Sequence, residues 1–109
     1  MAGEAWQSPT AELRAKLDGL GVAWKDLSEH CDRDGYSYRN ERTRFRSSDG
    51  RTVSCVFGWW RLYGHTHHFT YGGEEGLLEV AVIGDDGLVV GDPEPMSVAE
   101  VVGKYLEGR

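Results

Sequence analysis

The chain has 109 residues, of which 39% are hydrophobic and 28% charged, and its formal net charge at pH 7 is −6. This length predicts a single domain over residues 1–109, because two domains would each be too small to bury a core. The apolar runs fall far short of the ~20 residues that a membrane span needs. The first residues also lack the apolar stretch of a secretion signal. We therefore expect a cytoplasmic protein without membrane contact.

Residues 1–7 are expected to form a flexible tail, and the first helix is predicted directly after it. Ser8 can cap the free amides of a helix, and Pro9 suits its first position. Leu13, Leu17 and Leu20 then fall on one helical face. Gly21 is expected to end the helix. The polar residues 26–40 that follow predict mostly loop.

Two hairpins are predicted in the middle of the chain. Residues 41–47 and 51–63 read as strands joined across Ser48-Asp49-Gly50, because an Asp-Gly pair between alternating runs favours a tight turn. Residues 64–76, which are rich in glycine and histidine, are expected to form a long loop or a flared hairpin end. Residues 77–83 and 88–90 predict a second hairpin.

The last helix has the sharpest signal, since Ser97 and Glu100 form a capping box in which each side chain can bind the other residue's amide. Apolar residues follow at helical spacing, and Gly108 is expected to end the helix. Neither helix can bury its apolar face except on the strands. The sequence thus predicts an α+β fold, with an antiparallel sheet of four or five strands and an N-terminal and a C-terminal helix packed on one face.

Positive charge is concentrated in one segment of this acidic chain. Residues 33–61 hold seven arginines, no lysine and three acidic residues, which leaves a local charge of +4. Arg42, Arg44 and Arg46 alternate with other residues, so a strand would point all three to one side. An alternative is that they form the ordinary solvated face of a strand.

Large aromatic residues lie close to these arginines along the chain. Trp59 and Trp60 would point to opposite faces of a strand, so one is expected in the core and the other in contact with a partner. Aromatic residues beside arginine are frequent at interface centres. We expect the contact with the partner to be made by residues of two segments of the chain, 42–46 and 60–63. These residues are Arg42, Arg44, Arg46, Trp60, Arg61 and Tyr63.

The pattern predicts a binding protein rather than an enzyme, because no nucleophile motif or phosphate-binding loop is present. A protein partner is the first expectation. A nucleic acid is the alternative, since the arginine strand together with a group of aromatic residues and one more arginine could pair phosphates and stack bases. This group is Tyr36, Tyr38, Trp59, Trp60 and Arg61. A homodimer that pairs the arginine strand with an acidic edge is another.

A metal site is a further alternative, and no cofactor is expected. His65 and His67 would share a face of a strand, and with His68, and with His30 or Cys31 brought near, they could hold zinc. No established zinc spacing supports this interpretation. Cys31 and Cys55 are expected to remain separate thiols in a reducing compartment.

The two ends of the chain carry a resemblance to a known group of proteins. The run from Ala11 to Asp18, followed by Gly21-Val22 and Trp24, and the closing helix over residues 97–108 resemble small uncharacterised proteins encoded by phages and prophages of gut bacteria. The resemblance implies a small accessory protein, with interference in host defence as one role. It implies no catalytic residue.

Overall fold

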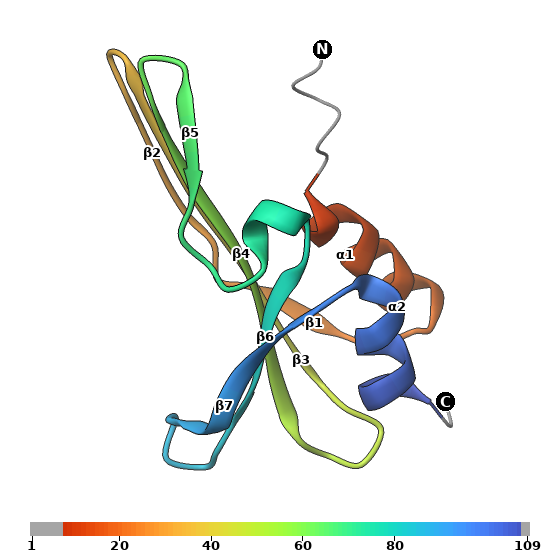
Figure 1. The fold of residues 1–109 in the computed structure, drawn as a ribbon. Coiled ribbons are helices and arrows are strands. Elements are labelled where there is room, and N and C mark those ends of the chain that lie inside the picture. Colours follow the sequence, from red (N-terminus) through yellow and green to blue (C-terminus); the bar gives the residue numbers. More distant parts are fainter. Residues whose placement is uncertain (1–7, 108–109) are drawn as a thin grey trace.

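The computed structural model describes residues 8–107, and this part has an α+β fold with a seven-stranded antiparallel sheet and a helix near each end (Figure 1). The helical elements are α1 (Pro9–Gly19), η2 (Gly73–Glu75), α2 (Val98–Val101) and η3 (Val102–Leu106), a π-helical turn that continues α2. The strands are β1 (Trp24–Asp26), β2 (Glu29–Arg33), β3 (Tyr36–Arg46), β4 (Thr52–Leu62), β5 (His65–His68), β6 (Leu78–Ile83) and β7 (Val89–Met96). The predicted fold class is confirmed. The tail predicted for residues 1–7 and the helix end predicted at Gly108 lie outside the described residues.

The sheet is built around the hairpin of β3 and β4, each of which has 11 residues. β1 and β2 both pair with β3, whereas β5 and β6 both pair with β4, and β7 adds to β6. One half of the hairpin, with β2 and β5, forms a projecting arm, and the other half, with β1, β6 and β7, forms the body (Figure 1). The strand number exceeds the expected four or five because residues 27–28 and 69–77 interrupt the strands on either side of this hairpin.

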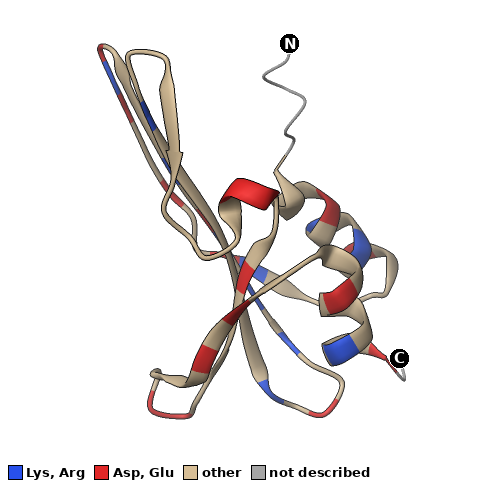
Figure 2. Cartoon of the chain, viewed as in Figure 1, with Lys and Arg blue, Asp and Glu red and all other residues tan. Residues whose placement is uncertain are grey.

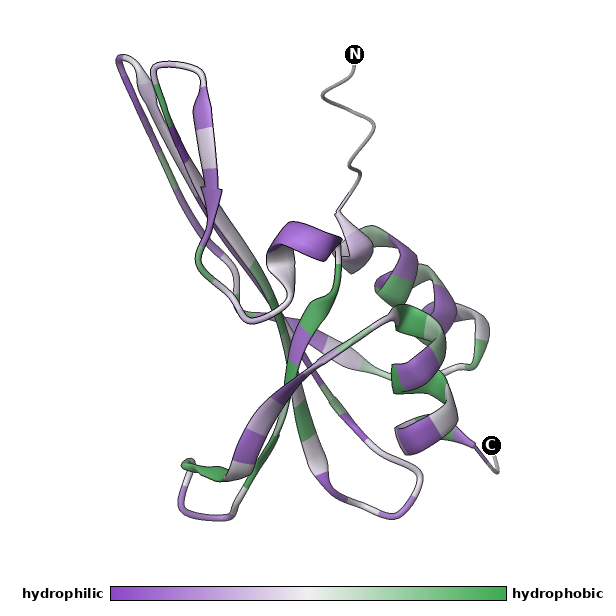
Figure 3. Cartoon of the chain, in the orientation of Figure 1, coloured by the Kyte–Doolittle hydropathy of each residue, from purple (hydrophilic) through white to green (hydrophobic). Residues whose placement is uncertain are grey.

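A single hydrophobic core lies between the body and the helices. Alternate residues of the body strands face Leu13 and Leu17 of α1 and Val101 of α2, all of which are fully buried. Burial of each such side chain stabilises the fold by about 1.5–3 kcal/mol. Figure 3 shows hydrophobic segments gathered on the body strands and the helices. The strand residues of this core include Phe45, Val53, Cys55, Phe57, Leu78 and Val80.

Both predicted helix starts are confirmed by their hydrogen bonds. The Ser8 hydroxyl accepts from the Thr10 amide at 3.0 Å. The Ser97 hydroxyl accepts from the Glu100 amide at 3.1 Å, and the Glu100 carboxylate accepts from the Ser97 amide at 2.8 Å. Leu20 differs from expectation, since it is the C-cap of α1 and is 42% exposed. The stripe of α1 therefore ends at Leu17.

The expectation of loop over residues 26–40 is wrong, because β2 and half of β3 lie there. Asp34-Gly35 joins these strands in a two-residue turn, with Gly35 at φ 76°. For residues 64–76 the sequence predicts a long loop or a flared hairpin end. The first alternative is wrong at its start, where Tyr63-Gly64 turns β4 into β5 and forms a hairpin. In the turn of β4 into β5, both Tyr63 and Gly64 have positive φ, 48° and 85°, as a type I′ turn requires.

The region before the last helix also forms a strand. Pro93 and Pro95, expected to lie between the second hairpin and the helix, belong to β7. β7 is an edge strand, and a proline is tolerated there because its missing N–H can face away from the ladder. Within residues 8–107, no helix has the length and apolar character needed to cross a membrane.

Candidate functional site

The two faces of the sheet carry different side chains. The odd-numbered residues of the β3–β4 hairpin point to the helices in the body, as the buried Thr43, Phe45, Val53, Cys55 and Phe57 show. The even-numbered residues point to the opposite side, because side chains alternate along a strand and directly paired residues share a face. No helix of the described chain packs on this second side, which we call the open face.

Four cations gather on the open face of the body. Arg42, Arg44 and Arg46 follow one another on β3, as predicted, and Lys25 of β1 lies directly opposite Arg44. These four residues are called the basic cluster. Like charges directly opposite each other destabilise a strand pair. A hollow of about 600 Å³ opens beside the cluster, lined in part by Lys25, Arg44, Arg46, Leu27 and Thr52.

Three residues of the basic cluster have no carboxylate partner among the described residues. In the described part of the chain, no ion pair is formed by Lys25, Arg42 or Arg44, and the buried Nε of Arg44 has no hydrogen-bond partner. Arg46 donates to the carbonyl oxygen of Gly50 at 3.0 Å. Lys25, Arg42 and Arg44 therefore keep positive charge that no carboxylate of the described residues neutralises.

Other arginines of the protein have carboxylate partners. Arg14 pairs with Asp26 at 3.0 Å, Arg39 with Asp32 at 2.9 Å and Arg51 with Asp49 at 3.0 Å. Hydrogen bonds from Arg51 and then Ser47 lower the pKa of Asp49 to about 2. Those from Arg39 lower the pKa of Asp32. The fold thus neutralises these three arginines and not Arg42 or Arg44.

Aromatic side chains occupy the open face of the arm. Tyr38 of β3 pairs with Trp60 of β4, which pairs with His67 of β5, so the three form a line across the strands. The Trp60 and His67 rings stack with centroids 4.5 Å apart, and Tyr38 stacks on Phe69 at 5.7 Å. Tyr38, Trp60, His67 and Phe69 are called the aromatic row. Gly58 makes room for Phe69, since a Cβ there would lie 2.3 Å from its ring.

Asn40 lies between the aromatic row and the basic cluster. It follows Tyr38 by two positions on β3 and precedes Arg42 by two, so all three share the open face. Asn40 is only 6% exposed, and its Oδ1 has no hydrogen-bond partner. A buried acceptor without a partner costs about 1–3 kcal/mol. Asn40 thus places an unsatisfied acceptor at the boundary between the aromatic row and the basic cluster.

The structure brings together four of the six residues expected to make the contact. Arg42, Arg44, Arg46 and Trp60 share the open face. Arg61 points to the other face, where its Nε donates to the Thr66 hydroxyl at 2.8 Å and its guanidinium lies 5.4 Å from the Trp59 ring centroid.

Tyr63 lies at the tip of the arm and not on the open face. Its backbone amide donates to Gly35 at 2.8 Å, and its ring lies over that glycine, although the residue is 77% exposed. Sequence reasoning missed Lys25, Asn40 and Phe69 as members of the site. For Lys25 the signal is the pairing of β1 with β3, which connects residues 19 positions apart.

The histidines do not converge on one point. His65 and His67 share the open face of β5, as expected of a strand, whereas His68 points to the other face and packs 5.4 Å from Phe57. Burial lowers the pKa of His68. Within residues 8–107, no group of three or more metal-binding side chains lies close enough to hold an ion.

The two cysteines differ in burial and in their place in the fold. Both are free: Cys31 lies on β2 beside Tyr38, not in a loop as expected, and Cys55 is in the core. Burial raises the pKa of the Cys55 thiol to about 12. Cys55 is therefore a core side chain.

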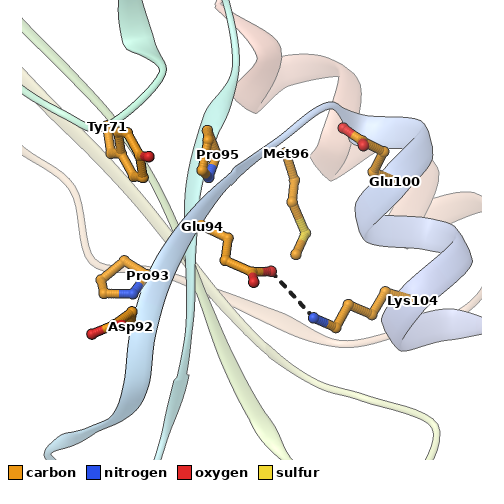
Figure 4. Close-up of a pocket in the computed structure, with 8 residues that line it drawn as sticks. All are labelled: Tyr71, Asp92, Pro93, Glu94, Pro95, Met96, Glu100 and Lys104. Atoms are coloured by element: carbon orange, nitrogen blue, oxygen red, sulfur yellow. Dashed lines mark hydrogen bonds and ion pairs between the residues drawn. The ribbon is translucent and has the colours of Figure 1, made fainter.

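Many of the acidic residues lie away from the basic cluster, although Glu29 and Glu79 border it on the open face. Figure 2 shows acidic segments on η2, on the turn between β6 and β7, and on the helices. A hollow of about 820 Å³ between β7 and α2 is lined by the carboxylates of Asp92, Glu94 and Glu100. Figure 4 shows Glu94 reaching across it to Lys104, with an O–N distance of 3.3 Å. This hollow is acidic, and its one lysine is already paired.

Comparisons with models of known protein families, with curated proteins and with solved structures gave no match. The function is therefore inferred from the geometry and charge of the open face.

Proposed function

We propose that this protein is a non-enzymatic binding protein whose open face holds a polyanionic macromolecule. The observation that carries the proposal is the basic cluster, in which Lys25 and Arg44 oppose each other without a carboxylate between them. A bound anion would remove this repulsion and would supply acceptors to the donors of Arg42 and Arg44. The cluster is thus arranged for a ligand at a cost to the free protein.

The net charge of −6 does not oppose this function at short range. The acidic side chains of the helices lie behind the sheet, and packed layers are about 10 Å apart. At physiological ionic strength charges are screened over about 8 Å, so a ligand on the open face senses mainly the cluster. On the open face itself, Glu29 and Glu79 lie outside the cluster, and Glu79 accepts from the Tyr71 amide at 2.6 Å.

Two classes of polyanion fit the cluster. An acidic segment of a host protein accords with the accessory role that the resemblance to phage proteins implies. A nucleic acid is the second candidate, favoured by the aromatic row on the same face. Both require positive charge at Lys25, Arg42 and Arg44, so one pair of variants tests the common proposal.

The test measures binding of fluorescein-labelled polyglutamate and of a labelled single-stranded oligonucleotide, each of about 15 units, by fluorescence anisotropy in about 50 mM salt. Lys25→Glu is compared with Lys16→Glu, which changes the net charge equally but lies exposed on α1. We expect the wild type to bind at least one polyanion, Lys25→Glu to lose it and Lys16→Glu to retain it. The proposal is contradicted if the wild type binds neither, or if both variants lose binding to the same extent.

A further inference from the structure

We infer that the polyanion is a single-stranded nucleic acid, with its phosphates on the basic cluster and its bases on the aromatic row. This inference rests on the proposed function and narrows it to one ligand class. The reason is that charge and rings occupy the same face of the same two strands. Acidic peptides and nucleic acids both need the charge, whereas only nucleic acids carry a stacking group in every unit.

The spacing along β3 suits a chain that lies lengthwise on the open face. Residues on one face of a strand recur about every 6.6 Å, because a strand rises about 3.3 Å per residue. Tyr38 and Arg42 are thus about 13 Å apart, and Arg44 lies one further step along. An extended single-stranded nucleic acid can therefore place a base against the aromatic row and successive phosphates against the basic cluster.

The rings of the aromatic row are held in position by one another. Tyr38 and Phe69 stack with an angle of 6° between their planes, and Trp60 and His67 with an angle of 21°. Phe69 is 46% exposed on this surface. Proteins that bind single strands combine such platforms with a positively charged track for the backbone. In a duplex the base faces are already stacked, so the row favours single strands.

The buried oxygen of Asn40 supports the same ligand. Oδ1 is an acceptor, and it lies between the groups assigned to bases and those assigned to phosphates. Ionised acidic side chains offer only acceptors, so in an acidic peptide only the backbone amides could donate to it. Nucleobases carry N–H donors on their edges. A base stacked at the near end of the row would bring such a donor toward Asn40.

The experiment compares labelled single-stranded DNA, single-stranded RNA, duplex DNA and polyglutamate of about equal length, bound to the wild type and to Trp60→Leu and Tyr38→Leu. Leucine keeps apolar bulk and removes the stacking surface. We expect either leucine variant to weaken single-strand binding about tenfold or more, while its binding to polyglutamate, if any, is unchanged. The DNA and RNA arms identify which strand the protein prefers.

Salt dependence provides a second measurement that does not depend on the folding of a variant. Lys25, Arg42 and Arg44 would contact three phosphates of a single-stranded nucleic acid. This predicts a slope of about −2 for the logarithm of the binding constant against the logarithm of salt concentration. Between 50 and 200 mM salt this is a loss of about 20-fold. We also expect quenching of tryptophan fluorescence on binding, because Trp60 would stack on a base.

The outcomes separate this inference from the proposed function. Binding of polyglutamate without binding of either single strand overturns the inference and leaves the proposed function standing. Binding of no polyanion overturns both. Duplex binding as tight as single-strand binding, or unchanged single-strand affinity in folded leucine variants, overturns the assignment of bases to the aromatic row.

Discussion

Replacing Lys25 by glutamate should stabilise the protein and at the same time remove its ligand binding. Lys25 lies directly opposite Arg44, and Arg42 and Arg46 flank Arg44 on the same face. In Lys25→Glu the new carboxylate faces Arg44, so a repulsive cross-strand pair becomes an attractive one. Opposite-charge pairs of this kind contribute about 0.2–1 kcal/mol, and like-charge pairs are destabilising.

We therefore expect the free energy of unfolding to rise by about 0.5–1.5 kcal/mol in low salt. At about 4–8 °C per kcal/mol for a domain near this size, the melting midpoint should rise by several degrees. The assay is urea unfolding followed by circular dichroism, repeated in high salt, where the gain should shrink because the pair is exposed to solvent. Lys16→Glu, which faces no strand, should show no such rise.

The double variant Lys25→Glu/Arg44→Gln tests the cause of the gain. Because the effect is assigned to one pair, removing Arg44 should remove the gain, and the double-mutant cycle should give the coupling. If Lys25→Glu leaves stability unchanged or lowers it, the description of this pair as a retained repulsion is wrong. If the variant is more stable and still binds the ligand, the cluster is not the binding site.

Three other predictions concern the core, the arm and the thiols. Leu17→Ala should lower the free energy of unfolding by about 2–5 kcal/mol in urea titration, because Leu17 is fully buried between α1 and the sheet; a loss below 1 kcal/mol would contradict this packing. Gly58→Ala should displace the Phe69 ring, since the added Cβ would lie 2.3 Å from it. The variant should therefore weaken oligonucleotide binding more than polyglutamate binding in the anisotropy assay. Equal effects on both ligands would count against base stacking on the aromatic row. In the folded protein near pH 8, DTNB should react quickly with Cys31 alone, because burial raises the pKa of Cys55 to about 12. In denaturant it should react quickly with both thiols. Two fast thiols in the folded state would be inconsistent with the buried core position of Cys55.

Sequence patterns predicted the body of this fold better than its arm. The helix caps at Ser8 and Ser97 and the turn at Asp49-Gly50 are local signals, and each depends on a few adjacent residues. The body strands also bury one face, so apolar residues recur every second position. In the body, the local signals of caps and turns and the alternation of apolar residues predict the same elements, so the sequence pattern indicates them clearly.

The arm lacks that pattern because neither α1 nor α2 packs on it, and only the short η2 contacts β4 and β5. All five residues of β2 are exposed or only partly buried, and so are the four residues of β5. These strands are held by ladder hydrogen bonds and by ring contacts such as that of Trp60 with His67. A strand without an apolar face gives no alternation to detect, so its residues read as loop.

The sequence predicted the residues of the candidate site that depend on local pattern and missed those that depend on contacts between distant segments. The alternation of Arg42, Arg44 and Arg46 is local, and the structure places them on one face as expected. The pairing of Lys25 with Arg44 depends on the register of β1 against β3, and register between distant segments is set by the whole fold. The position of Phe69 over Gly58 likewise depends on how the chain between β5 and β6 returns to the sheet.

Mapping of ligand contacts by nuclear magnetic resonance tests the central claim most directly. Amide and indole resonances would be followed while single-stranded oligonucleotide and, separately, polyglutamate are added. The open face as binding surface predicts shifts for Lys25, Arg42, Arg44 and the Trp60 indole with the oligonucleotide, and little change at the Trp24 indole, which donates to Asp18 on the helix side at 2.8 Å. Shifts confined to α1, η3 or the acidic hollow beside β7, with the open face unchanged, would contradict the claim.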